Sequence, residues 1–186
     1  MNIFMLHENQ QKCVESHCDK HVVKMVIEYA QLLSTAHRVL DGVMYMDKTA
    51  NGRNIKRWRI EGDEVKEWGL YKASHINHPC GIWVRESNAN YMYLHNLWYK
   101  LCKEYTHRYG KLHLTEAKLR SILCNPPKNI PFAPMADVHN MPQAMPDDAK
   151  IPNDVVSAYR RYYNMYKLDF AKYTNREEPQ WLRTGT

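Results

Sequence analysis

A row of ionisable side chains between residues 17 and 38 is the part of this sequence best suited to chemistry. Its members are spaced three or four residues apart and would share one helix face: His17, His21, Lys24, Glu28, Gln31, Thr35 and Arg38. Histidine exchanges protons near neutral pH, and a desolvated lysine amine can form a Schiff base. A nearby carboxylate can orient that amine or stabilise a developing cation. The first four members are our candidate catalytic residues; the alternative is a solvated face or a buried polar network.

A second, apolar stripe predicts the helix that would carry this row. It runs through Val22, Met25, Val26, Tyr29, Leu32, Leu33, Ala36 and Leu40. Gly42 is expected to end the helix, and Ser16 with Asp19 is typical of a capping box at its start. Further helices are predicted beyond Pro79 as far as Gly110, from Thr115 through Leu123, and after a cap at Asn153 or Asp154.

Two segments interrupt the helical pattern. Asn51-Gly52 predicts a β-hairpin inside an insertion at 43–73. Basic residues in its second arm either grip phosphates or are simply solvated: Lys56, Arg57 and Arg59. Residues 125–152 contain seven prolines and predict a long loop that packs down through Phe132, Met135, Met141 and Met145. The expected fold is therefore mostly α: one compact helical-bundle domain over residues 1–186, with a small hairpin insertion and a proline-rich loop.

Charge and composition indicate an anionic partner. The chain has 186 residues, 44 % of them hydrophobic, and a net charge of +6, which favours nucleic acid, a nucleotide or an acidic membrane. Candidate nucleic-acid-binding residues are His78, Arg85, Asn90, Arg108, Lys111, Arg160 and Lys167. We expect His78, Asn90 and Arg160 to face the row on the first long helix. No glycine-rich phosphate loop and no GxSxG motif occurs, and no cofactor is expected.

Cysteine usage and hydropathy suggest the compartment. Five widely spaced cysteines without a CxxC motif are typical of reduced thiols in an intracellular protein. No apolar run reaches bilayer length and no secretion signal is evident, so we expect a cytoplasmic protein without a membrane partner. Two His/Cys clusters are weak metal candidates because their spacing matches no common zinc signature, and no metal site is assigned. They are Cys13, His17 and His21, and His75, His78 and Cys80.

Several motifs together resemble a known group of proteins. MNIF, HCDKHVVKMVIE, NHPCGIWVRES, EYTHRYGKLH, AYRRYYNMYK and PQW resemble phage and bacterial proteins described as similar to pyrimidine-dimer DNA glycosylases of the endonuclease V type. The resemblance covers most of the chain outside 43–73. It implies an all-α, DNA-binding protein, in the host cytoplasm if phage-encoded, that acts on a flipped or damaged base. The glycosylase uses its N-terminal amine as nucleophile, with a glutamate and arginines on the first long helix.

The sequence departs from that enzyme at the implied site. Asn2 is a poor context for removal of the initiator methionine. The place of the catalytic glutamate falls near Lys24, with Glu28 one turn later, and Val23 and Ile27 stand in place of the arginines. Three functions stay open: a glycosylase and abasic-site lyase on a flipped or modified pyrimidine, a base-hypermodification transferase that displaces phosphate or pyrophosphate from a modified thymine, and a non-catalytic nucleic-acid- or nucleotide-binding protein.

Overall fold

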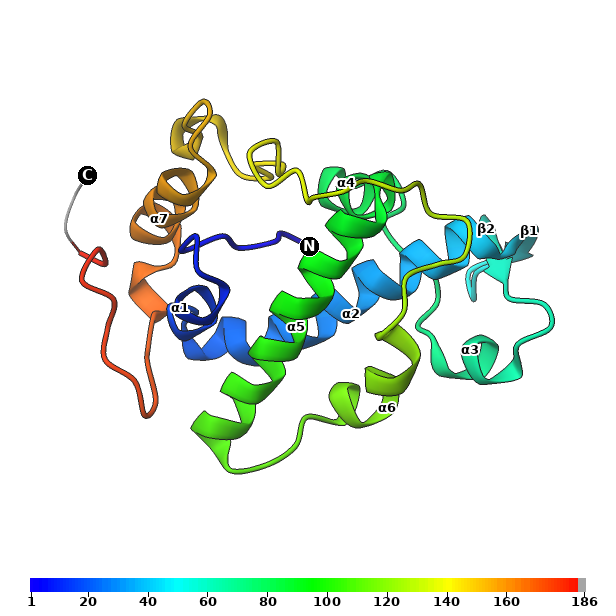
Figure 1. Cartoon of the computed structure of the whole chain (residues 1–186), viewed down its shortest axis with the longest axis horizontal. Helices are drawn as coiled ribbons and strands as arrows, with labels where there is room; N and C mark the ends of the chain where they lie inside the picture. The colour runs from blue at the N-terminus through cyan, green and yellow to red at the C-terminus, as the bar shows by residue number, and fades with distance from the viewer. Residues whose placement is uncertain (184–186) are drawn as a thin grey trace.

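Helices α2 and α5 form the centre of the fold in the computed structural model, which describes residues 1–183 (Figure 1). Within that range 51 % of the chain is helical, in seven helices, which confirms the mostly-α prediction. They are α1 (Gln10–Glu15), α2 (Asp19–Asp41), α3 (Glu64–Gly69), α4 (Pro79–Glu86), α5 (Asn88–Tyr109), α6 (Leu114–Leu123) and α7 (Val155–Tyr166). Strands β1 (Val43–Lys48) and β2 (Asn54–Arg59) form a hairpin, and short 3-10 turns occupy Asp147–Ala149 and Leu168–Phe170.

Helix α2 forms where the apolar stripe predicts it. Its apolar side chains are buried, and the Trp98 indole on α5 donates a hydrogen bond of 2.9 Å to the Val26 carbonyl. The helix ends at Gly42 as expected. The predicted capping box is wrong, because the cap residue is Cys18 and the Ser16 hydroxyl instead donates to the Lys12 carbonyl at 2.8 Å.

The segment beyond Pro79 forms two helices where the sequence predicted one. Pro79 is the first residue of α4, and Ser87 is extended between α4 and α5. The Ser87 hydroxyl accepts a hydrogen bond of 3.1 Å from the Asn90 amide, which starts α5. Gly110 ends α5 with a φ of 65°, a left-handed conformation that suits glycine. Helix α6 is capped by His113 and begins one residue before the predicted Thr115.

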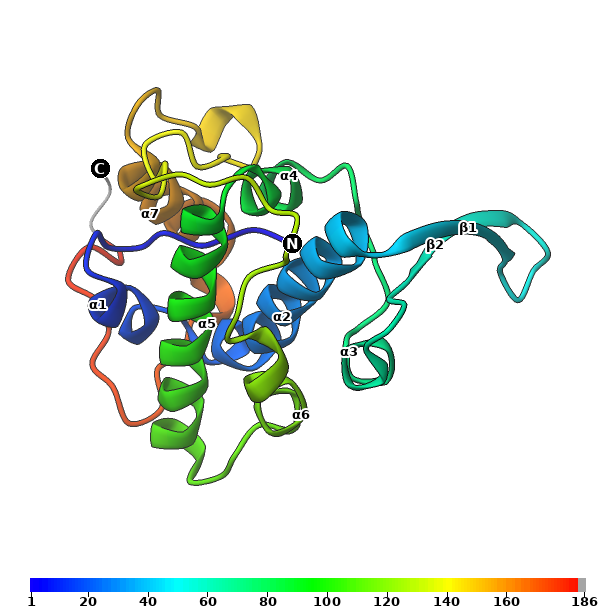
Figure 2. The same cartoon turned by 45° about the vertical axis from the view of Figure 1, so that its right-hand side comes forward.

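The N-terminal segment threads between α7 and the central helices, which places the start of the chain beside α2 (Figures 1 and 2). Ile3, Phe4 and Leu6 are buried there, and the Phe4 amide donates to the Tyr29 hydroxyl at 3.0 Å. Helix α7 is capped by Asp154, whose carboxylate accepts from the Ser157 amide at 2.9 Å, as predicted.

The proline-rich loop runs over α4 and α5 in an extended path (Figure 2). Met141, Met145 and Ala149 are buried in the same hydrophobic core as the helices, which confirms that the second half of the loop packs down. The prediction is wrong for the first half, where Phe132 and Met135 are 81 % and 76 % exposed. The chain beyond Thr174 folds back on α7, since the Asn164 side chain donates to the Trp181 carbonyl at 3.1 Å. None of the helices in residues 1–183 combines the length and hydropathy needed to cross a membrane.

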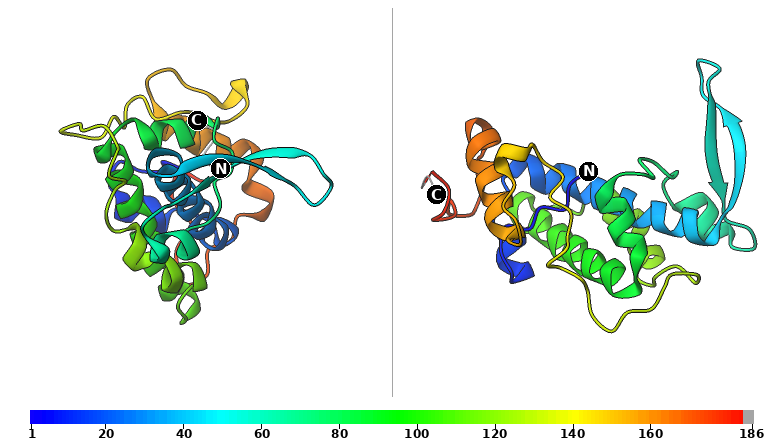
Figure 3. Two further views of the ribbon diagram at one scale, coloured as in Figure 1. Left: turned by 90° about the vertical axis from the view of Figure 1, so that its right-hand side faces the viewer. Right: turned by 90° about the horizontal axis from the view of Figure 1, so that it is seen from above.

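The hairpin leaves the body of the molecule at the end of α2. Its strands are antiparallel, in register from Val43 opposite Arg59 to Lys48 opposite Asn54, and Gly52 has a φ of 79° in the connecting turn. The ribbon projects on the side of α2 away from α5 (Figure 3). The predicted hairpin is confirmed, and the insertion also contains α3.

Candidate active site

A small cavity of about 170 Å³ opens where the chain start meets α2 and the end of α7. Three of the four predicted catalytic residues line it. The full lining is Met1, Asn2, Phe4, His21, Lys24, Met25, Glu28, Tyr162 and Lys167. The polar row of α2 therefore faces a cavity shared with distant parts of the chain over its second and third turns.

Glu28 is the acidic group of this cavity, and two amines flank it. The amine of Met1 lies 3.6 Å from Glu28 Oε2, and Lys24 Nζ lies 3.2 Å from Oε1. The side chains of the two residues differ in exposure: the Met1 side chain is 5 % exposed, whereas the Lys24 side chain is 68 % exposed. No local pattern in the sequence indicates the Met1 amine; only the family resemblance does.

His21 forms one wall of the cavity. Its ring stacks on Phe4 with centroids 4.4 Å apart, and Nδ1 forms a hydrogen bond with the Tyr163 hydroxyl. Burial lowers the pKa of His21 to about 3, and the positive charges of His17, Lys167 and Lys24 act in the same direction. At neutral pH the imidazole is therefore uncharged, so the expectation that it exchanges protons near pH 7 is wrong.

His17 lies outside the cavity and is fully buried. Nδ1 lies 2.8 Å from the Cys13 carbonyl, to which it must donate, and Nε2 lies 3.2 Å from the Tyr29 hydroxyl. Because that hydroxyl also accepts the Phe4 amide, His17 ties the N-terminal segment to α2. Burial lowers the pKa of His17 to about 4. Its predicted catalytic role is wrong, since both ring nitrogens are engaged and no solvent reaches them.

One of the predicted nucleic-acid-binding residues, Lys167, lies at this site, and a second, His78, is outside the cavity lining but within electrostatic range of it. Lys167 lines the cavity, with its amine 4.7 Å from the Tyr162 ring centroid. His78 caps α4. Burial lowers the pKa of His78, the N-terminal amine lowers it further, and Glu28 raises it, which places His78 within electrostatic range of the amine and carboxylate. Tyr162, which the sequence reasoning did not select, comes from the Tyr- and Arg-rich helix α7.

Three other candidates are internal structural residues. Arg108 is 3 % exposed and binds Glu104 at 2.7 Å and Asp19 at 2.9 Å. Asn90 is also buried; its amide donates to the Trp83 carbonyl at 2.9 Å. Arg85 is half-buried and donates to the Ile76 carbonyl at 2.6 Å. The predicted nucleic-acid contacts of Arg108 and Asn90 are wrong, because both side chains are buried and hold neighbouring segments of the fold together. The nucleic-acid contact of Arg85 stays a prediction.

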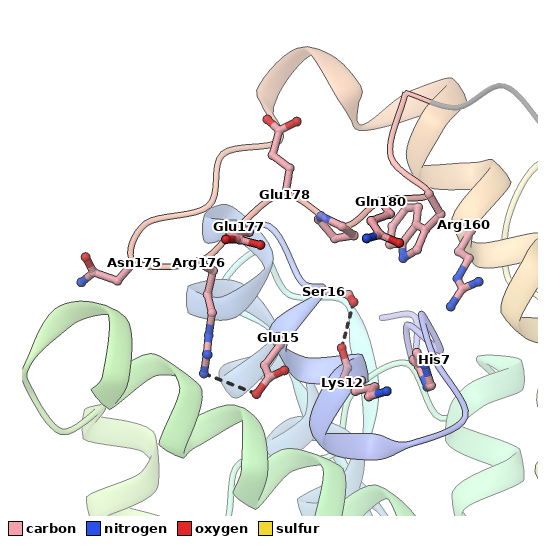
Figure 4. Close-up of a pocket in the computed structure, with 12 residues that line it drawn as sticks. His7, Lys12, Glu15, Ser16, Arg160, Asn175, Arg176, Glu177, Glu178 and Gln180 are labelled. Atoms are coloured by element: carbon pink, nitrogen blue, oxygen red, sulfur yellow. Dashed lines mark hydrogen bonds and ion pairs between the residues drawn. The ribbon is translucent and has the colours of Figure 1, made fainter.

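The last two candidates lie apart from the cavity. Arg160 lines a second, wider cavity of about 960 Å³ between α1 and the C-terminal segment (Figure 4). Its guanidinium donates to the Leu6 carbonyl at 2.9 Å and lies 5.5 Å from the Trp181 ring centroid. Lys111 is exposed in the turn between α5 and α6. Neither residue faces the row on α2.

The two His/Cys clusters do not assemble into metal sites. Among residues 1–183, no group of three His, Cys, Asp or Glu side chains has the geometry to hold a metal ion. The Cys13 thiol instead donates to the Phe4 carbonyl at 3.2 Å. All five cysteines are free thiols. A comparison with known proteins gave no match to any protein-family model, curated protein or solved structure.

Proposed function

We propose that this protein is a DNA glycosylase with abasic-site lyase activity that acts on a flipped pyrimidine nucleotide. The observation that carries the proposal is the Glu28 carboxylate set between two amines at the opening of a cavity. An amine paired with a carboxylate is the minimum set for Schiff-base chemistry at a sugar carbon. The net charge of +6 supports a polyanionic substrate.

The reaction divides into steps that this pair supports. The neutral amine attacks C1′ of the deoxyribose, the N-glycosidic bond breaks, and its electron pair leaves with the base, which takes up a proton. The amine loses its proton and the sugar ring opens to an iminium ion. A carboxylate such as Glu28 then removes a C2′ proton, and the 3′ phosphate leaves by β-elimination. Water hydrolyses the iminium and returns the free amine.

The Met1 amine is better placed than Lys24 to be the nucleophile. Met1 is partly buried as a residue and its side chain is 5 % exposed, against 68 % for the Lys24 side chain, so the Met1 amine lies in the less hydrated surroundings, which favours nucleophilic attack. α-Amines are also less basic than lysine amines in general. Lys24, with most of its side chain in water, is suited to hold a phosphate beside the target nucleotide.

Borohydride trapping on an abasic duplex tests this function. A covalent adduct is expected, and peptide mass mapping should place it on the Met1 amine or on Lys24. Glu28→Gln should slow trapping by about 100-fold or more, as expected for loss of an acid–base group. Glu64→Gln, an exposed glutamate on α3, is the matched control and should trap at the wild-type rate. DNA binding without any adduct would refute the lyase and favour a binding protein.

A base-modifying transferase is the second candidate, favoured by the cations of the cavity. Lys24, Lys167 and Met1 line the same cavity, and such a cluster of cations can hold a leaving phosphate or pyrophosphate. Mass spectrometry of nucleosides from DNA co-expressed with the protein separates the two. New modified thymidines that vanish in Lys167→Ala support transfer, whereas abasic sites or strand breaks support the glycosylase.

A further inference from the structure

The β1–β2 hairpin is an exposed arm whose root is anchored to the helical body. All six residues of β1 are exposed, and the ribbon stands clear of the helices (Figure 3). Two-stranded ribbons are only marginally stable alone, so an exposed one needs an anchor. Here a buried arginine near the end of α2 is the anchor.

Arg38 fastens the root of the hairpin to the body. It is 4 % exposed and donates to the Trp58 carbonyl of β2 at 3.0 Å and to Glu67 of α3 at 2.6 Å. The same Glu67 oxygen accepts the Ile60 amide at 2.8 Å. Gly42 lets β1 leave α2 closely, because a Cβ there would lie 2.4 Å from the Arg38 carbonyl oxygen. The arm is therefore held in a fixed direction at its root.

Most of the protein's excess positive charge lies on this arm. Residues 43–59 carry five basic side chains and one acidic side chain, a net charge of +4, against +6 for the whole chain of 186 residues. The basic residues are Lys48, Arg53, Lys56, Arg57 and Arg59. A charge so concentrated on a projecting ribbon creates a local field that attracts a polyanion.

The free cations gather on one face and at the tip. The strand register puts Met44, Met46 and Lys48 on the same face as Asn54, Lys56 and Trp58. On the opposite face Arg57 forms an ion pair with Asp47 at 3.8 Å. Arg59, the last residue of β2, forms an ion pair at 3.6 Å with Glu61, which follows the strand. Within residues 1–183, Lys48, Lys56 and Arg53 form no ion pair and are exposed.

We propose that this face, with Arg53 at the tip, binds the backbone and groove of double-stranded DNA. The major groove admits a two-stranded ribbon, and lysines and arginines on it reach phosphates. Glu28 and Gly42 are 14 residues apart on or next to α2, so the root lies about 21 Å from the cavity along the helix. That distance corresponds to about six base pairs along the axis of a DNA duplex. The choice of DNA as the polyanion rests on the proposed function.

Salt titration of duplex binding tests the arm separately from the chemistry. The probe is a labelled duplex with a stable abasic-site analogue, followed by fluorescence anisotropy. The triple variant Lys48→Gln, Arg53→Gln, Lys56→Gln should weaken Kd by about tenfold or more and reduce the log–log salt slope by about 2 to 3. The matched control removes equal charge from α6 and the loop after it: Lys118→Gln, Arg120→Gln and Lys128→Gln. It should change the slope by less than about 1.

Each alternative result identifies what has failed. Equal losses in both triple variants would refute a role for the arm, as would equal losses for single- and double-stranded probes. A changed sedimentation coefficient with unchanged DNA binding would assign the ribbon to self-association instead. If the wild-type protein binds the duplex with the expected salt slope while borohydride trapping never occurs, the lyase proposal fails and the arm proposal stands.

Discussion

Two glutamates on the two central helices have opposite surroundings. Glu104 on α5 is 2 % exposed and fully engaged: it accepts Arg108 at 2.7 Å and Arg176 at 3.0 and 2.8 Å. Burial acts to raise the pKa of Glu104, but the hydrogen bonds from Arg176 and Arg108 outweigh it and hold the pKa below its usual value. This carboxylate is locked into a closed network with no position left for a ligand.

Glu28 on α2 has cations nearby but a less complete set of contacts. Its two amine partners lie at 3.2 and 3.6 Å, and the carboxylate borders a cavity. The same residue type beside positive groups therefore has two different roles. In the closed network every polar atom serves the fold, whereas at the cavity the ionic partners leave room for a third group. The comparison indicates that a structural ion pair differs from a reactive one in how completely the hydrogen-bonding positions of the carboxylate are occupied, and not in burial or charge alone.

The largest effect is expected when one partner is removed from the Glu104–Arg108 pair and one from the Glu28–amine pair. Arg108→Ala removes the buried cation between Glu104 and Asp19, which leaves Arg176 as the cation beside Glu104 and Thr174 as the donor to Asp19, and it should lower the free energy of unfolding by about 3 kcal/mol. Glu28→Gln should lower it by less than about 1 kcal/mol, because water in the cavity replaces the lost contacts. Urea denaturation measures both. Equal losses in the two variants would make Glu28 a structural residue.

The pH dependence of stability gives a second, smaller test. The pKa of His17 is lowered from 6.5 to about 4 by burial, so the unfolded chain binds a proton before the folded one. Stability is therefore lost as pH falls from about 6.5 towards 4. His17 alone should account for about 2 kcal/mol between pH 7 and pH 5. His17→Gln should flatten the urea-midpoint profile over that interval by this amount; an unchanged slope would show that His17 does not titrate as described.

Local signals predicted the elements correctly where the cause is local. Gly42, Gly110 and the Asn51-Gly52 turn act through backbone conformation, and Asp154 caps α7 through its own carboxylate. Ser87 was missed because an extended serine between two apolar helical patterns looks like a helix interior. The spacing on α2 correctly predicted a shared face, but it did not predict what lies opposite each side chain.

Those opposite groups come from distant parts of the chain. Arg108 meets Asp19 and Tyr163 meets His21, so the fold engages residues with suitable chemistry. The Met1 amine reaches Glu28 only because the N-terminal segment threads beside α2. Spacing within one helix holds no information on either event. The part of the site that the sequence predicted is therefore the part on α2, namely His21, Lys24 and Glu28, together with Lys167, which was selected only for its charge.

A matched pair of tyrosines sharpens the comparison with the smallest expected effects. The Tyr91 hydroxyl lies in the closed interior, where it contacts His37 Nε2 at 2.9 Å and donates to the Leu123 carbonyl at 3.0 Å. Tyr91→Phe leaves both groups unsatisfied and should cost about 1–3 kcal/mol. The Tyr163 hydroxyl instead contacts His21, which borders the cavity. Tyr163→Phe should cost about 1 kcal/mol or less, because a water molecule at the cavity can replace the hydroxyl.

Thermal unfolding of the two variants side by side measures the difference, since both lose one hydroxyl from one buried tyrosine. Tyr91→Phe is expected to lower the Tm more than Tyr163→Phe. The reverse order would mean that water cannot reach His21, and the cavity would then be closed to a substrate at that wall. In that case Glu28 would have to act without the imidazole beside it, and the amine–carboxylate pair alone would define the site.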